Sequence, residues 1–276
     1  MNAWKWGGIG LVLLLVLVPI GGFAVLLFPP GFMYDHYSTY SYTTSITTNG
    51  TVENATVSLP FPAGEDVAPD LDSTLWIYDD EGNRLTDWNP RIADTAHGPM
   101  LRLEPGRLVG EDRYILWTHS ENGSPVDRRT IGPDQIPENM TNRRLIPDPT
   151  SYSISWQVPV DHDIETRYPI GNASFLAPAT DMRAADCRHG WADEEVACSN
   201  FTTMTRATYE AEGSAVLTVG EIRFTGTNEW GFWLSNSYNT FETTISPQSS
   251  TDGRHGWTAV DGHLHAGEGR YDGPKR

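Results

Sequence analysis

The clearest indication of the fold is the stretch YSYTTSITTNGTVENATVSL, residues 40–59. Its first half alternates Tyr and Ile with Ser and Thr, which is the pattern of a β-strand with one buried face. Its second half repeats the pattern, with Ala55, Val57 and Leu59 on one face and polar residues on the other. The Asn49-Gly50 pair between the halves is typical of a tight turn. The stretch therefore predicts two antiparallel strands joined as a β-hairpin.

Similar short alternating runs, separated by turn residues, continue over most of the chain. They predict an all-β fold, an antiparallel two-sheet sandwich over residues 31–248. Residues 121–150 contain five prolines and are interpreted as a loop or linker. That interpretation leaves open two smaller sandwiches, at residues 33–120 and 151–248. We favour a single domain, because two would leave more strand edges exposed.

A change of register near Gly220 is visible in the last group of predicted strands. The apolar residues Leu217 and Val219 occupy odd positions, whereas Ile222 and Phe224 occupy even ones. A β-bulge at Gly220 would bring all four side chains to the core face. Strand ends near Gly220 would explain the same pattern.

The N-terminal segment, residues 1–30, is predicted to be a membrane anchor. The run from Trp6 to Phe28 has 23 residues and no charge. As a helix it would be about 34 Å long, enough for a hydrocarbon core of roughly 30 Å. The alternative is a cleaved signal peptide, whose apolar core is usually only about 7–15 residues long. Lys5 favours a cytoplasmic N-terminus, so we expect a single-pass protein of the cell membrane with everything after the anchor outside the cell.

Two further features agree with export. The only cysteines, Cys187 and Cys198, are interpreted as a disulfide that closes a small loop in an oxidising compartment. Six Asn-X-Ser/Thr sequons all follow the anchor, as glycosylation outside the cell requires. Their acceptor residues are Asn49, Asn54, Asn122, Asn139, Asn172 and Asn200.

The charged residues are unusual in kind as well as in number. The formal net charge is -17, and lysine occurs only at Lys5 and Lys275, while the other 17 basic residues are all Arg. Such a surface repels nucleic acid and anionic lipid headgroups, so nucleic acid is excluded as a partner. With the anchor, sequons and β pattern, this composition resembles the uncharacterised membrane-anchored surface proteins of haloarchaea. The resemblance rests on composition and organisation, and it implies no activity and no site residues.

Residues 249–276 are rich in Gly, His and Asp and are interpreted as a flexible tail, with room for a small hairpin at Asp261-Gly262. A His-x-His pair on a strand places both imidazoles on one face, and a third His could complete a zinc site with an open position. The candidate ligands are His255, His263 and His265. The alternative is that these histidines are simply solvated.

Other clusters offer weaker indications. Asp161-His162-Asp163 fits no calcium-loop spacing and is interpreted as a solvated acidic loop. Arg-His-Gly-Trp occurs at residues 188–191 and 254–257, but the flanking sequences do not match, which favours coincidence. The nucleophile-elbow, phosphate-loop, dinucleotide-binding and zinc-protease motifs are absent from the sequence.

These observations favour a non-enzymatic cell-envelope protein without a cofactor. Its anchor would contact membrane lipid, and its β domain would bind a neighbouring surface protein, a glycan or a subunit of a membrane complex. The alternative is a metal-dependent extracellular hydrolase that uses the His-rich C-terminal region.

Overall fold

The computed structural model describes residues 34–63, 71–120, 122–173, 175–187, 196–211, 213–232, 235–247 and 256–271. These residues form strands and two short helical segments. In chain order the elements are β1 (Tyr34–Thr48), β2 (Val52–Leu59), β3 (Phe61–Ala63), α2 (Leu71–Thr74), β4 (Leu75–Tyr78), β5 (Arg91–Thr95), β6 (Gly98–Leu108), β7 (Tyr114–His119), β8 (Pro125–Ile131), η2 (Pro133–Gln135), β9 (Arg143–Pro147), β10 (Thr150–Val160), β11 (Phe175–Ala177), β12 (Thr180–Ala185), β13 (Ala197–Ala211), β14 (Leu217–Val219), β15 (Ile222–Phe232), β16 (Ser235–Ile245) and β17 (Thr258–Gly269).

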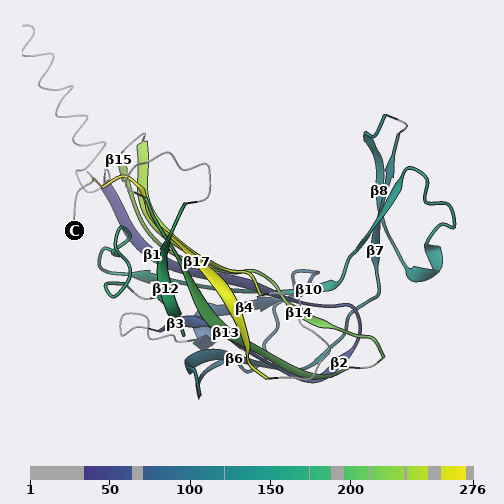
Figure 1. Cartoon of the computed structure of the whole chain (residues 1–276), viewed down its shortest axis with the longest axis horizontal. Helices are drawn as coiled ribbons and strands as arrows, with labels where there is room; N and C mark the ends of the chain where they lie inside the picture. The colour runs from purple at the N-terminus through teal and green to yellow at the C-terminus, as the bar shows by residue number, and fades with distance from the viewer. Residues whose placement is uncertain are drawn as a thin grey trace, which may run out of the picture.

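The prediction of an all-β, antiparallel fold is confirmed. Ten strands lie in the order β4-β10-β1-β15-β16-β17-β13-β2-β6-β5, and β12 and β14 complete a twelve-stranded sheet by pairing with β13 and β1. Strand β13 pairs with β17 through residues 197–205 and with β2 through residues 206–211, so it continues from one part of the sheet into the other. The sheet is strongly curved, and buried residues from both parts form one hydrophobic cluster (Figure 1).

The predicted hairpin at residues 40–59 is wrong in its pairing. Strand β1 pairs with β10, β14 and β15, whereas β2 pairs with β6 and β13. Both strands exist, and Ala55, Val57 and Leu59 are buried as predicted. Alternation fixes which face of a strand is buried, but not which strand lies beside it. The Asn49-Gly50 turn therefore carries the chain from one part of the sheet to the other.

The predicted C-terminal tail is an ordered strand over residues 258–269. Strand β17 lies between β13 and β16, with Leu264 and Ala266 each 2% exposed. Asp261-Gly262 lies within this strand and forms no hairpin turn. The tail was predicted because this segment is rich in glycine, but glycine has a packing role here. Gly262 is opposite Phe201, whose ring lies where a Cβ would be placed. Glycine here makes room for an aromatic neighbour.

Residues 121–150, interpreted from sequence as a loop or linker, contain two strands. Strands β8 and β9 flank β7 in a separate three-stranded antiparallel sheet. Their prolines stand at strand ends, at Pro125 and Pro147, where a missing N–H is tolerated. The linker interpretation is therefore wrong for these strands. Because β1 pairs with both β10 and β15, strands from before and after this segment share one sheet, which rules out two separate sandwiches.

The register change at Gly220 has the predicted structural effect. Leu217, Val219, Ile222 and Phe224 are all buried. The chain advances four residues between Val219 and Arg223, while the partner strand β1 advances three between Ile46 and Thr43. This single extra residue is the insertion that defines a bulge, although β14 and β15 are separate strands around it.

In the part of the chain that the structure describes, no helix is long and apolar enough to cross a membrane. The predicted anchor at residues 1–30 lies outside the described residues.

Candidate functional site

The three-stranded sheet β7–β9 projects from the body and is called the arm, residues 114–147. Figure 1 shows the arm at one end of the long axis, opposite the end where β1 begins. It is inserted between β6 and β10, so both of its ends return to neighbouring points of the body. A projecting sheet of this kind exposes more surface than the same strands would if packed on the body.

Close packing and an ion pair fix the root of the arm. A Cβ on Gly110 would lie 2.4 Å from the carbonyl oxygen of Thr48, so only glycine fits there. The backbone N–H of Asp148 donates to the carbonyl of Arg113 at 2.9 Å. The Arg113 guanidinium lies 2.8 Å from the Asp80 carboxylate, and this hydrogen bond raises the pKa of Arg113. The arm is therefore attached to the body at several points.

One face of the arm carries an aromatic residue between two arginines. Trp117 on the central strand β7 is directly opposite Arg128 on β8 and Arg144 on β9, so the three side chains share a face. The Arg128 guanidinium carbon lies 5.5 Å from the centroid of the Trp117 ring. Both arginines are exposed, and Val126, farther along β8, is 66% exposed. The three residues Trp117, Arg128 and Arg144, with Val126, are called the arm face.

The opposite face of the arm is packed. Leu116 is fully buried and Ile131 is 6% exposed. These two residues are not part of the main hydrophobic cluster of the body. The arm thus has a small core on one side and an open, partly apolar surface on the other. A sheet that leaves such a face open is a candidate for binding a partner.

The arm also differs from the body in charge. It contains four arginines and four acidic residues, so its formal net charge is zero and the rest of the chain carries the whole -17. Arginine pairs with carboxylates in a planar, two-pronged geometry that lysine cannot reproduce. The arm face is therefore suited to an acidic surface.

A polar cleft of about 530 Å³ lies beside the root of the arm. Its side chains include five carboxylates, two arginines and two aromatic residues: Asp79, Asp80, Glu81, Asp87, Glu111, Arg107, Arg113, Trp88 and Tyr152. Hydrogen bonds from Asn83 lower the pKa of Asp79. No group of three or more His, Cys, Asp or Glu among the described residues has an arrangement that could hold a metal ion. We therefore assign no ligand to this cleft.

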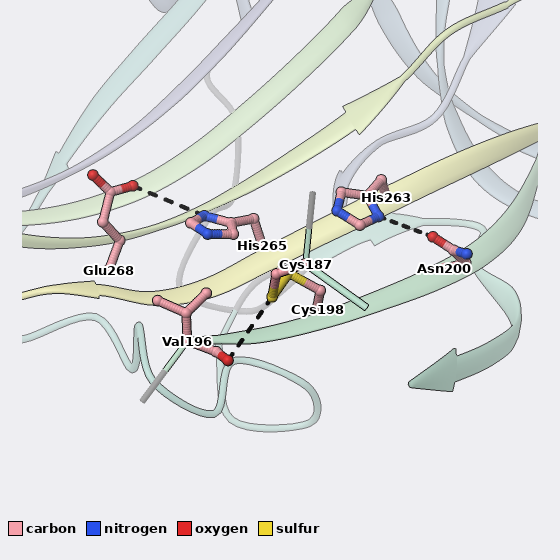
Figure 2. Close-up of a disulfide and its surroundings, with 7 residues drawn as sticks. All are labelled: Cys187, Val196, Cys198, Asn200, His263, His265 and Glu268. Carbon is pink, nitrogen blue, oxygen red and sulfur yellow. Dashed lines mark hydrogen bonds and ion pairs between the residues drawn. A yellow bond between two sulfur atoms is a disulfide. The ribbon is translucent and has the colours of Figure 1, made fainter. Parts of the chain in front are cut away.

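The predicted disulfide between Cys187 and Cys198 is present (Figure 2). Cys187 lies in the segment after β12, and Cys198 lies on β13. Strands β12 and β13 also pair with each other, with Ala185 opposite Cys198. Cys198 is 5% exposed. The bond therefore closes the loop between the two strands at the end of the body where β13 begins.

Replacing both cysteines, Cys187→Ser with Cys198→Ser, should lower the free energy of unfolding by about 3 kcal/mol, because the unfolded chain regains the freedom of a closed loop of about 12 residues. Denaturant unfolding at molar salt measures this. The loss should disappear when the wild type is compared with the variant under reducing conditions. An unchanged unfolding midpoint in oxidising buffer would contradict the structural role.

Two of the three histidine candidates lie together on β17. Figure 2 shows His263 and His265 beside the disulfide on the neighbouring strand, on one face as the His-x-His pattern predicts. His263 Nδ1 lies 2.9 Å from Asn200 Oδ1, and His265 Nδ1 lies 3.8 Å from Glu268 Oε2. Their positions on a central strand are fixed rather than mobile. His255 lies outside the described residues.

The six sequon asparagines, Asn49, Asn54, Asn122, Asn139, Asn172 and Asn200, are all exposed. Asn122 is in the turn between β7 and β8, and Asn139 lies between η2 and β9, so two acceptors are on the arm. Asn172 Nδ2, the atom that would carry a glycan, donates to the Tyr168 carbonyl at 3.0 Å. Glycosylation of these residues stays a prediction.

The remaining clusters stay apart from the arm. In the Asp161-His162-Asp163 run both carboxylates are exposed, as expected for a solvated loop. Asp163 also lies 3.1 Å from His36 Nε2 on β1. The first Arg-His-Gly-Trp segment, residues 188–191, and the first two residues of the second, 254–257, lie outside the described residues.

The sequence did not predict the arm face. Arg128 and Arg144 lie inside the Pro-rich segment, where the prolines indicated a loop. The pairs Arg128-Arg129 and Arg143-Arg144, in an otherwise acidic chain, were the available signal.

Comparison with known proteins gives no relative: no protein-family model, curated protein or solved structure matches this chain.

Proposed function

We propose that this is a non-enzymatic, membrane-anchored protein of the cell envelope whose arm binds an acidic partner protein outside the cell. The arm face is the observation that carries the proposal: an open sheet face on which Trp117 is flanked by Arg128 and Arg144. Tryptophan and arginine are the residue types that most often dominate binding energy at protein interfaces.

The position of the arm supports this function. The predicted anchor precedes β1, and the arm lies at the opposite end of the body (Figure 1). Strand β1 alone has 15 residues, which spans roughly 46 Å at about 3.3 Å per residue. In an anchored protein, the arm face would therefore stand well away from the lipid, where a neighbouring envelope protein can reach it.

The charge of the arm face favours an acidic partner over the other candidates. Arg128 and Arg144 lie on the strands on either side of Trp117, so one guanidinium group flanks the ring on each side. This arrangement suits two carboxylates on a partner surface. Molar salt screens long-range attraction but leaves short, two-pronged hydrogen bonds in place. Of the histidines on which the hydrolase alternative rests, His263 and His265 lie on β17, and His255 lies outside the described residues.

The test is photo-crosslinking in native membranes at native salt. A photoreactive amino acid in place of Val126 should give one discrete adduct with an acidic protein, whereas the same amino acid in place of Glu210, exposed on β13, should not. No adduct from position 126, or the same adducts from both positions, would overturn the proposal. An adduct with a second copy of this chain, or with a glycan alone, would also overturn it.

Changing Arg128→Gln and Arg144→Gln together should reduce the yield of that adduct at least tenfold, because both charged contacts are lost. The matched control is Arg183→Gln with Arg206→Gln, which also removes two exposed arginines. As with Arg128 and Trp117, the Arg206 guanidinium carbon lies near a tryptophan ring, 5.8 Å from the Trp257 centroid. The control should stay within twofold of the wild type. Equal losses in both variants would point to net charge rather than to the arm face.

A further inference from the structure

The end of the body where β1 begins carries exposed aromatic and apolar residues that are not part of the arm face. Strand β1 starts at Tyr34, directly opposite Phe232 at the end of β15, and β16 starts nearby at Ser235. Strand β10 ends at the same place, because Val160 is opposite Ser38. Four strand ends therefore meet where the chain arrives from the predicted anchor. This end is called the proximal end.

A buried hydrogen-bond network holds the loop of residues 161–173 across the proximal end. The Ile164 N–H donates to Asn228 Oδ1 at 2.8 Å, and Asn228 Nδ2 donates to the Ile164 carbonyl at 2.8 Å. Farther along the loop, Thr166 Oγ1 donates to Asn239 Oδ1 at 2.7 Å. The backbone carbonyl of Thr166 accepts from the Gly267 N–H at 2.9 Å. The loop thus crosses from β15 to β17 in a fixed position.

Large apolar and aromatic side chains are exposed around this end. Tyr168 is 66% exposed and Ile170 is 52% exposed on the loop, while Tyr37 on β1 and Tyr238 on β16 are each 45% exposed. Trp230, opposite His36, is partly exposed. Tyrosine and tryptophan are the residues that gather at membrane–water interfaces, because they combine an apolar ring with a polar group. These five residues are called the proximal rim.

The length of the connecting chain limits how far the proximal rim can stand from a membrane. Five residues, 29–33, separate the uncharged run Trp6–Phe28 from Tyr34. Fully extended, they reach at most about 18 Å. All five are Pro, Gly, Phe or Met, and the first charged residue after the run is Asp35. An anchored body therefore cannot move away from the headgroup region.

We infer that the proximal rim rests on the lipid surface, at the depth of the headgroups, in addition to the anchor itself. This rests on the proposed anchoring. The two rim tyrosines of the sheet already pair with acidic residues: Tyr37 donates to Glu229, and Tyr238 donates to Glu268 at 2.9 Å. The carboxylates oppose deep insertion and anionic lipids, so the surface that fits is one of neutral headgroups.

The test uses the full chain in phosphatidylcholine vesicles at molar salt, with a spin label on Ile170→Cys and, as control, on Val126→Cys of the arm. The label at residue 170 should be at least fivefold less accessible to a water-soluble nickel relaxation agent than the label at residue 126. A vesicle-bound chain with equal accessibility at both positions would overturn the inference alone. A chain that does not float with the vesicles would overturn the anchoring, and the inference with it.

Discussion

Transfer from molar salt to dilute buffer should unfold the protein. The chain carries a formal net charge of -17, and two charges 10 Å apart in water repel with about 0.4 kcal/mol before screening. At 1 M salt the Debye length is roughly 3 Å, so almost none of this repulsion remains, whereas at 0.01 M it is roughly 30 Å and most of it returns. Summed over many neighbouring pairs, the repulsion reaches the whole stability of a domain, about 5–15 kcal/mol.

Attraction within surface ion pairs opposes the repulsion among the carboxylates, but it is too weak to offset that repulsion. Arg223 lies 3.0 Å from Glu221 and 3.2 Å from Glu242, and Arg91 lies 2.7 Å from Glu104. Such exposed pairs strengthen in dilute buffer, yet each contributes only about 0–1 kcal/mol. The net effect of lowering the salt should therefore be strongly destabilising.

Thermal unfolding followed by circular dichroism between 0.01 M and 3 M NaCl measures this effect. The melting temperature should fall steeply as the salt is reduced, and the β signal should be lost in the most dilute buffer. A control in dilute buffer at pH 4, where part of the carboxylate charge is neutralised, should recover some of the structure. A melting temperature that does not depend on salt would contradict the expectation.

Asn228→Ala should lower the free energy of unfolding by about 4 kcal/mol. Asn228 is 4% exposed and bonds both the N–H and the carbonyl of Ile164, and its Nδ2 also donates to Asn239 Oδ1 at 2.7 Å. Alanine would leave these buried groups without their partner, and each such group costs about 1–3 kcal/mol. For a chain of this size the melting temperature should fall by roughly 10 °C.

The matched control is Thr227→Ala, the adjacent residue on the other face of β15. Thr227 Oγ1 makes one side-chain hydrogen bond, to Thr240 Oγ1 at 2.8 Å, so its loss should cost about 1 kcal/mol. Limited proteolysis should also show faster cleavage within residues 161–173 in Asn228→Ala only. Equal stability losses in the two variants would show that the network does not hold the loop.

The sequence predicted which segments form strands better than it predicted which strands pair in the sheet. Ala55, Val57 and Leu59 are buried as their alternation indicated, and the parity change at Gly220 corresponds to one extra residue opposite β1. Pairing depends on contacts between residues far apart in the chain, which alternation cannot encode. That is why the pattern at residues 40–59 indicated a hairpin between strands that belong to different parts of the sheet.

Glycine and proline content caused the two larger errors. The Gly-rich composition of residues 249–276 indicated a flexible tail, yet the missing side chain of Gly262 makes room for the Phe201 ring inside the sheet. The prolines of residues 121–150 indicated a linker, yet Pro125 and Pro147 stand at the ends of arm strands. The candidate site could not be found from sequence alone, because Trp117, Arg128 and Arg144 are brought together only by the register of three strands.

The most direct test of the account is labelling of the arm in intact cells. Val126→Cys should react fully with a membrane-impermeant maleimide before lysis, and the labelled chain should stay in the membrane fraction after a carbonate wash. The native cysteines are joined to each other in the disulfide and should not react. Labelling that occurs only after lysis, or release of the chain by the wash, would contradict an anchored protein that presents its arm outside the cell.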